Sequence, residues 1–326
     1  MLRHAALAAT AGYVPDREIT NDALRAAHGE VIDKLEAATG IRTRFVAPPS
    51  WAASDLALPA ARRALERAGI PADQIDLVIV GTDTPDYLTP ATSVVLQHKL
   101  GATRAGTFDV GCACASFPTA IANAAGMIAS NTWIEHVLVV GVYAMHKLAA
   151  PDDPTRFFYG DGAAAAVLRA ADAPGVIASA LRADGSYAPR WGIFAGGSAE
   201  PASEAAIRAG RTNVRLLERY PPEVNDEGWP ILVRQLAERG GFSIRDIDLA
   251  IFTQVRSGTI DKAMAALELP AERTHKIMAT WGYTGSACVG MALDDALAHG
   301  KAGPGSLVVL VGSGVGYNQA GVALRL

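Results

Sequence analysis

Apolar residues follow two patterns along the chain, and together they predict alternating strands and helices. Continuous apolar runs at residues 75–82 and 137–142 are typical of strands buried on both faces of a parallel sheet. Residues 54–69 have the spacing of an amphipathic helix that stops at a glycine. The same reasoning predicts further helices at residues 21–39 (with Asn21 as the N-cap), 92–100, 117–128 and 286–299, and further strands near the start of the chain and at 107–110, 164–168 and 276–279.

The order of these elements repeats within the chain. The segment 67–69 followed by the apolar run 75–79 returns, 172 positions later, as 239–241 followed by 247–251. The run 137–141 returns at almost the same offset, as 308–312. We therefore predict two similar α/β halves related by duplication, residues 1–172 and 173–326. Between the repeated segments, residues 184–225 are rich in Gly, Ala and Pro and are expected to wrap the fold as loops and short helices.

Cys114 is the first candidate catalytic residue, because its position in the sequence suits a nucleophile. A predicted strand ends at Val110, a bend of small residues follows, and an apolar helix begins near Phe117. Free backbone N–H groups and the positive end of the helix dipole converge at such a bend, and they favour the nucleophilic thiolate over the thiol. The alternative is a small buried cysteine that packs as an apolar residue, which is what we expect of Cys112 and Cys288.

The repeat also predicts which residues surround Cys114. The offset places Gly285 opposite Cys114, at the start of the matching helix in the second half. Ligands in open α/β sheets bind outside the carboxyl ends of the strands. We therefore expect Cys114, Thr253, Tyr283 and the glycine-rich turn 312–316 to meet at one site.

Composition and charge exclude several classes of function. The net charge of −4 and the pI near 6.0 provide no basic patch for nucleic acid or an anionic membrane. No apolar run reaches the roughly 18 residues of a membrane span, and we interpret residues 1–11 as a first strand rather than a signal peptide. Three cysteines without a CxxC pair favour the reducing cytosol, so a cytoplasmic location is expected.

The sequence predicts no metal site, because its histidines and acids lack metal-ligand spacing. The turn 160–162 has the glycines of a phosphate loop but lacks the Lys-Ser/Thr of a P-loop. His146 follows a predicted strand at the active edge and is a candidate base, whereas His98 and His275 are interpreted as structural.

Five segments together resemble the thiolase-like superfamily, and most closely the ketoacyl-ACP synthase III family. They are Thr39-Gly40-Ile41-Arg42, Asp109-Val110 leading to Cys114-Ala115-Ser116-Phe117, Tyr159-Gly160-Asp161-Gly162-Ala163, Ala195-Gly196-Gly197-Ser198, and the glycine-rich turn before the last strand. The resemblance implies a thiolase-like α/β fold, with two duplicated halves in a layered α-β-α-β-α arrangement. It also implies a homodimer, an acyl thioester of coenzyme A or acyl carrier protein as substrate, and no bound cofactor.

The same resemblance assigns roles to individual residues. Cys114 would accept the acyl group, and the backbone N–H groups of Cys114 and Val315 would form the oxyanion hole. Tyr87 and Leu88 lie in a segment similar to the one that lines the acyl tunnel from the partner subunit. Arg256 is a further candidate for substrate binding.

Two departures from the family bear on the reaction. Condensing enzymes of this type use a His and an Asn to bind the malonyl thioester carbonyl, and here these positions read Thr253 and Tyr283. A Thr hydroxyl cannot shuttle a proton near neutral pH, and one lost oxyanion donor costs on the order of 3 kcal/mol of transition-state stabilisation. Tyr283 either restores one donor or fills the space. The coenzyme A clamp is also altered, because Lys34 and Ala38 stand near the expected Trp and Arg.

These observations leave three hypotheses. The first is an acyltransferase of specialised or lipid-like metabolism, in which Cys114 takes an acyl group from a thioester and passes it to an oxygen, nitrogen or carbon nucleophile. The second is an atypical condensing enzyme that still forms carbon–carbon bonds, with Tyr283 or a nearby His assisting. The third is a non-catalytic subunit that pairs with an active homologue, which the retention of Cys114 disfavours.

Overall fold

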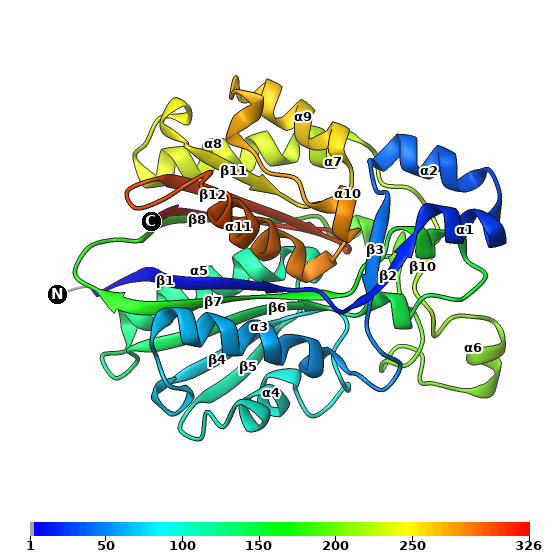
Figure 1. Ribbon diagram of the computed structural model, residues 1–326, viewed down its shortest axis with the longest axis horizontal. Coiled ribbons are helices and arrows are strands. Elements are labelled where there is room, and N and C mark those ends of the chain that lie inside the picture. Colours follow the sequence, from blue (N-terminus) through cyan, green and yellow to red (C-terminus); the bar gives the residue numbers. More distant parts are fainter. Residues whose placement is uncertain (1–2) are drawn as a thin grey trace.

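The computed structural model describes residues 3–326, and two sheets of matching topology form its framework (Figure 1). The first sheet has five strands, in the order β1 (His4–Tyr13), β7 (Gly162–Ala171), β6 (His136–Tyr143), β4 (Leu77–Gly81) and β5 (Gly106–Val110). The second has four strands, in the order β8 (Val176–Ala183), β13 (Asn318–Arg325), β12 (Leu307–Gly314) and β11 (Leu249–Phe252). Met1 and Leu2 lie outside the described residues, and the predicted first strand begins at His4.

The repeat in the sequence corresponds to a repeat in strand pairing. In the first sheet β4 pairs parallel to β6, which pairs antiparallel to β7, and β7 antiparallel to β1. In the second, β11 pairs parallel to β12, followed by antiparallel β13 and β8. Every residue of β4 and of β12 is buried, which explains their continuous apolar runs.

Helices cover both outer faces and fill the space between the sheets, which confirms the layered α-β-α-β-α arrangement (Figure 1). The outer face of the first sheet carries α3 and α4, the central layer holds α5 and α11, and α8 packs on β8 and β13, with α9 beside it. Their bounds are α3 (Ala53–Ala68), α4 (Thr92–Leu100), α5 (Ser116–Ser130), α11 (Cys288–Ala298), α8 (Gly228–Gly240) and α9 (Ser257–Ala266).

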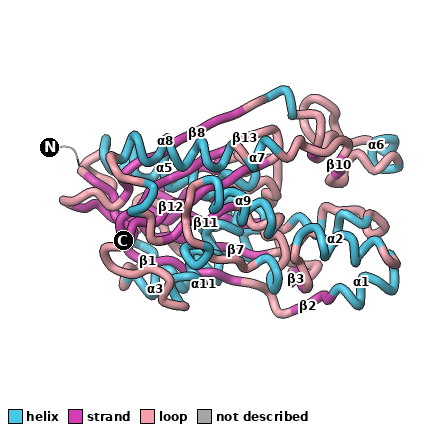
Figure 2. The backbone as a smooth tube through the Cα atoms, turned by 90° about the horizontal axis from the view of Figure 1, so that it is seen from above, coloured by secondary structure: helices cyan, strands magenta, loops and turns pink. Residues whose placement is uncertain are grey.

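Two excursions extend from one end of the layers (Figures 1 and 2). The irregular segment predicted at 184–225 forms loops and short elements, as expected. The first excursion comprises β2 (Arg17–Thr20), α1 (Asn21–His28), α2 (Val31–Thr39) and β3 (Thr43–Val46). The second comprises β9 (Trp191–Gly192), α6 (Glu204–Arg208), β10 (Arg215–Leu216) and α7 (Glu223–Asp226). The chain also forms the short 3-10 helices η1 (Ala72–Gln74), η3 (Met145–Lys147), η4 (Pro154–Phe157), η5 (Gly185–Tyr187), η6 (Ile244–Asp246) and η7 (Ala271–Arg273).

Two predicted elements were wrong. The single helix at 21–39 is two helices, because the chain turns at Gly29, whose φ of 63° ends α1. The N-cap is Thr20, whose Oγ1 accepts from the backbone N–H of Ala23, whereas Asn21 is buried and its amide donates to the carbonyl of Ile41. The strand predicted at 276–279 is replaced by α10 (Met278–Trp281). Its backbone is diverted because the N–H of Ile277 donates to the side chain of Gln254.

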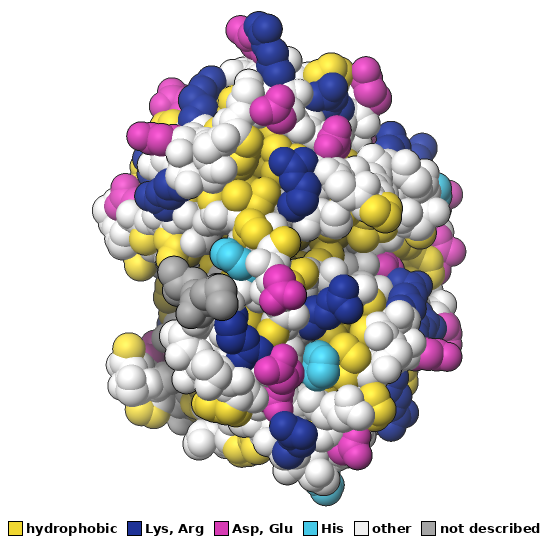
Figure 3. All heavy atoms as spheres, turned by 90° about the vertical axis from the view of Figure 1, so that its left-hand side faces the viewer, with side chains coloured by type: hydrophobic (Ala, Val, Ile, Leu, Met, Phe, Trp, Pro, Cys, Tyr) yellow, Lys and Arg dark blue, Asp and Glu magenta, His cyan; other side chains and the backbone are white. Residues whose placement is uncertain are grey.

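Charges of both signs are interspersed on the end of the molecule that carries the two termini (Figure 3). This distribution agrees with the small net charge and shows no large basic patch on that face. Within residues 3–326, no helix combines the length and the apolarity that a membrane crossing requires.

Asp109 connects the nucleophile strand to its neighbouring helix, and its loss is expected to destabilise the fold. From β5 its carboxylate accepts from the backbone N–H groups of Thr92 and Ser93, at 2.7 and 2.8 Å, and so caps α4. Asp109→Ala should lower the free energy of unfolding by about 1–2 kcal/mol, measured by urea denaturation. Asp172→Ala, at an exposed position, serves as the control and should change it by less than about 0.5 kcal/mol. Equal stability of the two variants would contradict the capping role.

Candidate active site

The bend that carries Cys114 is built where the two halves meet. β5 ends at Val110, η2 (Ala113–Ala115) holds Cys114, and α5 begins at Ser116. β12 of the other half approaches so closely that a Cβ at Gly314 would lie 2.6 Å from the Cys114 nitrogen. Cys114 is only 3% exposed. The glycine-rich end of β12 therefore faces the backbone of the nucleophile bend, as the sequence predicted.

The matching bend in the second half supplies Tyr283. η8 (Gly285–Ala287) precedes α11 and contacts η2, as the repeat predicted for Gly285. Gly285 has a φ of +40°, and a Cβ there would lie 2.2 Å from the ring of Tyr143. This close approach positions Tyr283, whose hydroxyl donates to the Cys114 sulfur over 2.5 Å. Tyr283 thus both fills the site and provides one hydrogen-bond donor.

Burial dominates the acidity of Cys114. Desolvation raises the pKa of its thiol well above the usual value, and the nearby Asp83 carboxyl raises it further. The hydrogen bond from Tyr283 lowers it. Burial also raises the pKa of Tyr283, so its hydroxyl stays neutral and keeps its proton to donate. The expected preference for thiolate is therefore opposed by burial, and deprotonation of Cys114 requires a proton acceptor.

Thr253 occupies a wall of the site. It follows β11, is 1% exposed, and its Oγ1 accepts from the backbone N–H of Ser313 at 2.8 Å. This contact ties the end of β11 to β12, close to Val315. Thr253 therefore lies where the family His was expected, but its hydroxyl oxygen is engaged with the backbone.

Two neighbouring pockets lie at the site, and the inner one is lined by Cys114. The inner cavity, of about 190 Å³, is lined by Asp83, Cys114, Tyr143, Met145, Trp191, Gly192, Ile193, Val214, Tyr283 and Val315. An outer pocket of about 430 Å³ shares Trp191, Tyr283 and Val315 with it and also contains Thr253 and Arg256. The structure therefore brings together five predicted residues: Cys114, Thr253, Tyr283, Val315 and Arg256.

Asp83 is a cavity residue that the sequence reasoning missed. It follows Thr82 at the carboxyl end of β4, the edge at which ligands bind in such sheets. Its Oδ1 accepts from the hydroxyl of Ser286 at 2.8 Å. Burial raises the pKa of Asp83 to about 6, against the lowering effect of that hydrogen bond. A carboxyl directly after a predicted buried strand was the signal that could have identified it.

Other candidates lie elsewhere. Tyr87 and Leu88 are 58% and 80% exposed and do not line the cavity of their own chain, so their contribution to a partner stays a prediction. His146 is buried outside the cavity lining, and its backbone N–H donates to the carboxylate of Asp161. Burial and the nearby Arg156 lower the pKa of His146 to about 4, so its imidazole is neutral at pH 7. His98 is exposed on α4.

One cluster has the residue types of a metal site. His275, Asp295 and His299 place their ligand atoms within 4.8 Å of one another. Asp295 and His299 are four residues apart, and His275 precedes Asp295 by 20 residues. His275 Nε2 already lies 2.6 Å from the carboxylate of Asp295, so this contact is explained as a hydrogen-bonded pair. His299 is largely exposed. His275 is thus paired structurally, as predicted.

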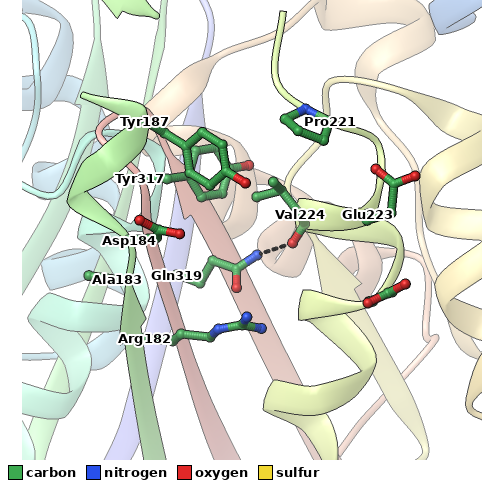
Figure 4. A pocket seen from close by; sticks show the side chains of 10 residues that line it. Arg182, Ala183, Asp184, Tyr187, Pro221, Glu223, Val224, Tyr317 and Gln319 are labelled. Atoms are coloured by element: carbon green, nitrogen blue, oxygen red, sulfur yellow. Dashed lines mark hydrogen bonds between the residues drawn. The ribbon is translucent and has the colours of Figure 1, made fainter. Parts of the chain in front are cut away.

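A further pocket of about 160 Å³ opens beside the site without including Cys114 (Figure 4). Tyr317 lines both this pocket and the outer pocket. Two hydrogen bonds hold the floor of this pocket in place: the side-chain amide of Gln319 donates to the carbonyl of Val224, and the hydroxyl of Tyr317 donates to the side chain of Asn225. Tyr317 therefore forms a wall between this pocket and the route to Cys114.

Sequence comparisons match two segments of the chain to one family. A family model for 3-oxoacyl-[acyl-carrier-protein] synthase III matches residues 108–185, and the model for the C-terminal part of the same enzymes matches residues 237–326. A curated relative is the beta-ketoacyl-[acyl-carrier-protein] synthase III of Symbiobacterium thermophilum. It is 36% identical over 318 residues, which cover 96% of this chain and 95% of the relative.

Solved structures agree with these matches. The 3-oxoacyl-(acyl carrier protein) synthase III of Pseudomonas aeruginosa superposes with a TM-score of 0.90 at 30% identity, covering 99% of this chain and 98% of the other. The priming beta-ketosynthase of the R1128 polyketide biosynthetic pathway also has a TM-score of 0.90, at 29% identity, covering 100% and 97%.

Proposed function

This chain belongs to the 3-oxoacyl-[acyl-carrier-protein] synthase III family, and on that premise we propose that it is an acyltransferase that uses Cys114 as its acyl carrier. One observation carries the proposal. Tyr283 stands where condensing relatives are expected to have an Asn, and its hydroxyl donates directly to the Cys114 sulfur. The nucleophile is thus supported, while the His and Asn expected to stabilise a malonyl enolate are absent.

Acyl loading needs only groups that this chain retains. The Cys114 thiol loses its proton as the sulfur bonds to the carbonyl carbon of a donor thioester. The bond from that carbon to the donor sulfur then breaks, and the donor leaves as a thiol that has taken up one proton. The backbone N–H groups of Cys114 and Val315 would hold the oxyanion, in the place that the close approach of β12 provides. Neither donor depends on the side chains at 253 and 283. Loading and transfer draw on the chain's own residues, and we propose no additional cofactor.

The outer pocket suits the arm of a thioester donor. Arg219 and Arg256 line it, and Lys262 lines it while paired with Asp226. These cations fit the phosphate of a pantetheine arm, whereas the apolar inner cavity fits the acyl chain. Because Lys34 and Ala38 replace the expected coenzyme A clamp, we favour an acyl carrier protein over coenzyme A as the donor. We further propose a homodimer in which Tyr87 and Leu88 reach the partner's tunnel.

Incubation with a panel of acyl-coenzyme A and acyl-carrier thioesters, followed by intact mass measurement, tests the proposal. A mass gain equal to one acyl group is expected in the native protein. The absence of any gain would overturn the acyltransferase assignment and favour the non-catalytic subunit.

A condensing enzyme is the second candidate, because the curated relatives are named as beta-ketoacyl synthases. Release of carbon dioxide from a malonyl thioester would identify this activity. We expect none from the native protein. The double variant Thr253→His with Tyr283→Asn would restore the expected family residues, and its gain of carbon dioxide release is the positive control. If the native protein released carbon dioxide, we would assign it as a condensing enzyme and not as an acyltransferase.

A further inference from the structure

We propose that Asp83 is the general base of this site: it takes the proton from a hydroxyl or amine acceptor as that acceptor attacks the acyl group on Cys114. The inference rests on the acyltransferase function proposed above and specifies its acceptor as a protic nucleophile. Asp83 and Cys114 lie on different elements, after β4 and after β5, yet they line the same cavity of about 190 Å³.

The composition of the cavity leaves Asp83 alone in this role. Among the described residues that line it, Asp83 is the only carboxyl, and there is no histidine, lysine or arginine. The other titratable groups that face it are Cys114, Tyr143 and Tyr283, and behind them lies Cys288. Burial raises the pKa of each of these groups, so all four are protonated near pH 7. Asp83 is therefore the cavity group that can accept a proton at that pH.

Ser286 stabilises Asp83 in both protonation states. Its hydroxyl carries one hydrogen and lies 2.8 Å from Asp83 Oδ1 and 3.1 Å from the carbonyl oxygen of Ala113. When Asp83 is a carboxylate, the Ser286 hydroxyl donates to it. When Asp83 is protonated, the acid can donate to Ser286, which then donates to Ala113. Ser286 can therefore keep a hydrogen bond to Asp83 while Asp83 gains and loses a proton.

The transfer step balances with these groups alone. The acceptor oxygen or nitrogen forms a bond to the acyl carbon, while its proton passes to the Asp83 carboxylate. As the tetrahedral intermediate collapses, the bond from the acyl carbon to the Cys114 sulfur breaks. Asp83 then returns the proton to that sulfur. The products are an ester or amide and the free Cys114 thiol, with Asp83 again a carboxylate.

The test uses acyl-enzyme prepared with whichever donor gave a mass gain, freed of excess donor. Its decay is followed by intact mass with n-butanol as a protic acceptor, and separately with hydroxylamine, which attacks thioesters without a base. Asp83→Asn keeps an oxygen to accept from Ser286 but cannot take a proton. It should slow transfer to n-butanol by about 100-fold or more and change the hydroxylamine reaction by less than about threefold. Asp153→Asn, an N-cap outside the cavity lining, is the matched control and should leave both rates unchanged.

Two further readouts separate a base from a structural residue. Native transfer to n-butanol should rise with pH to a plateau above about 6, following the Asp83 carboxylate, and Asp83→Asn should lose that rise. Because the pKa of Asp83 is raised in the folded state, the folded protein binds more protons than the unfolded chain between pH 3.8 and about 6, so this group destabilises the fold as pH rises through that window. Asp83→Asn should therefore raise the melting temperature more at pH 7 than at pH 4.

Each outcome decides the inference. If Asp83→Asn transferred the acyl group to n-butanol at the rate of the native protein, the role of Asp83 as base would be overturned. Equal slowing with n-butanol and hydroxylamine would also overturn it, because it would indicate general damage to the site. If Asp83→Asn does not fold, Asp83→Ser is judged by the same ratio of the two rates. Failure of the native protein to form any acyl-enzyme would overturn the acyltransferase function itself. A native acyl-enzyme with an unaffected Asp83 variant would overturn only the role of Asp83.

Discussion

Cys114→Ala is expected to abolish covalent acylation, with the rate of acyl-enzyme formation falling by at least about 10⁴-fold. The sulfur is the atom that bonds to the acyl carbon, and alanine leaves no thiol among the described residues that line the cavity. The substitution removes one buried atom at the start of the central helix layer, so the fold should persist. Intact mass after incubation with the donor panel measures the effect directly, and circular dichroism confirms that the variant is folded.

The other two cysteines provide the controls for this experiment. Cys112 lies two residues away and is half-buried, and Cys288 is fully buried in the core. The described residues that line the inner cavity include neither Cys112 nor Cys288. Cys112→Ala and Cys288→Ala should therefore keep the mass gain of the native protein. A gain that persists in Cys114→Ala, or that disappears only in Cys112→Ala, would show that the acyl group is carried elsewhere.

The sequence predicted the framework because its strands are buried on both faces. Runs such as those of β4 and β12 contain no polar alternation, and their repetition at one offset indicated the duplication. Of the two failures, one is a local turn at a glycine and the other is a tertiary contact that overrides the local pattern. Gly29 divides a helical segment whose apolar spacing continues across it. The side chain of Gln254 takes the N–H of Ile277 and diverts a segment that otherwise resembles a strand.

The site was predictable where it depends on strand ends and the repeat. That reasoning placed Cys114, Tyr283 and Val315 together, and the structure does the same. The pKa of Cys114 could not be predicted from the sequence. The helix terminus beside Cys114 can be read from neighbouring residues, but its desolvation depends on residues distant in sequence, such as Trp191, that line the cavity. The contact between Asp83 and Ser286 spans 203 positions, so no local pattern reveals it.

Tyr283→Phe is expected to slow acylation of Cys114 by about 10–100-fold. The substitution removes only the hydroxyl that donates to the sulfur over 2.5 Å, and the ring remains packed against Tyr143. A hydrogen bond to a charged group is worth about 1.5–3 kcal/mol, and this one stabilises the thiolate that attacks the donor. The rate of acyl-enzyme formation, followed by intact mass at saturating donor, measures the loss.

The pH dependence distinguishes this role of Tyr283 from simple packing. The hydrogen bond lowers the pKa of Cys114 against the larger effect of burial, so its removal should move the alkaline rise of the acylation rate to higher pH. Tyr159→Phe removes the buried hydroxyl of another tyrosine whose ring packs near Tyr143, with centroids 6.3 Å apart, and should leave both rate and profile unchanged. If Tyr283→Phe slowed acylation without moving the profile, the hydroxyl would act on the donor rather than on the sulfur. If it slowed nothing, Tyr283 would only fill the space of the missing asparagine.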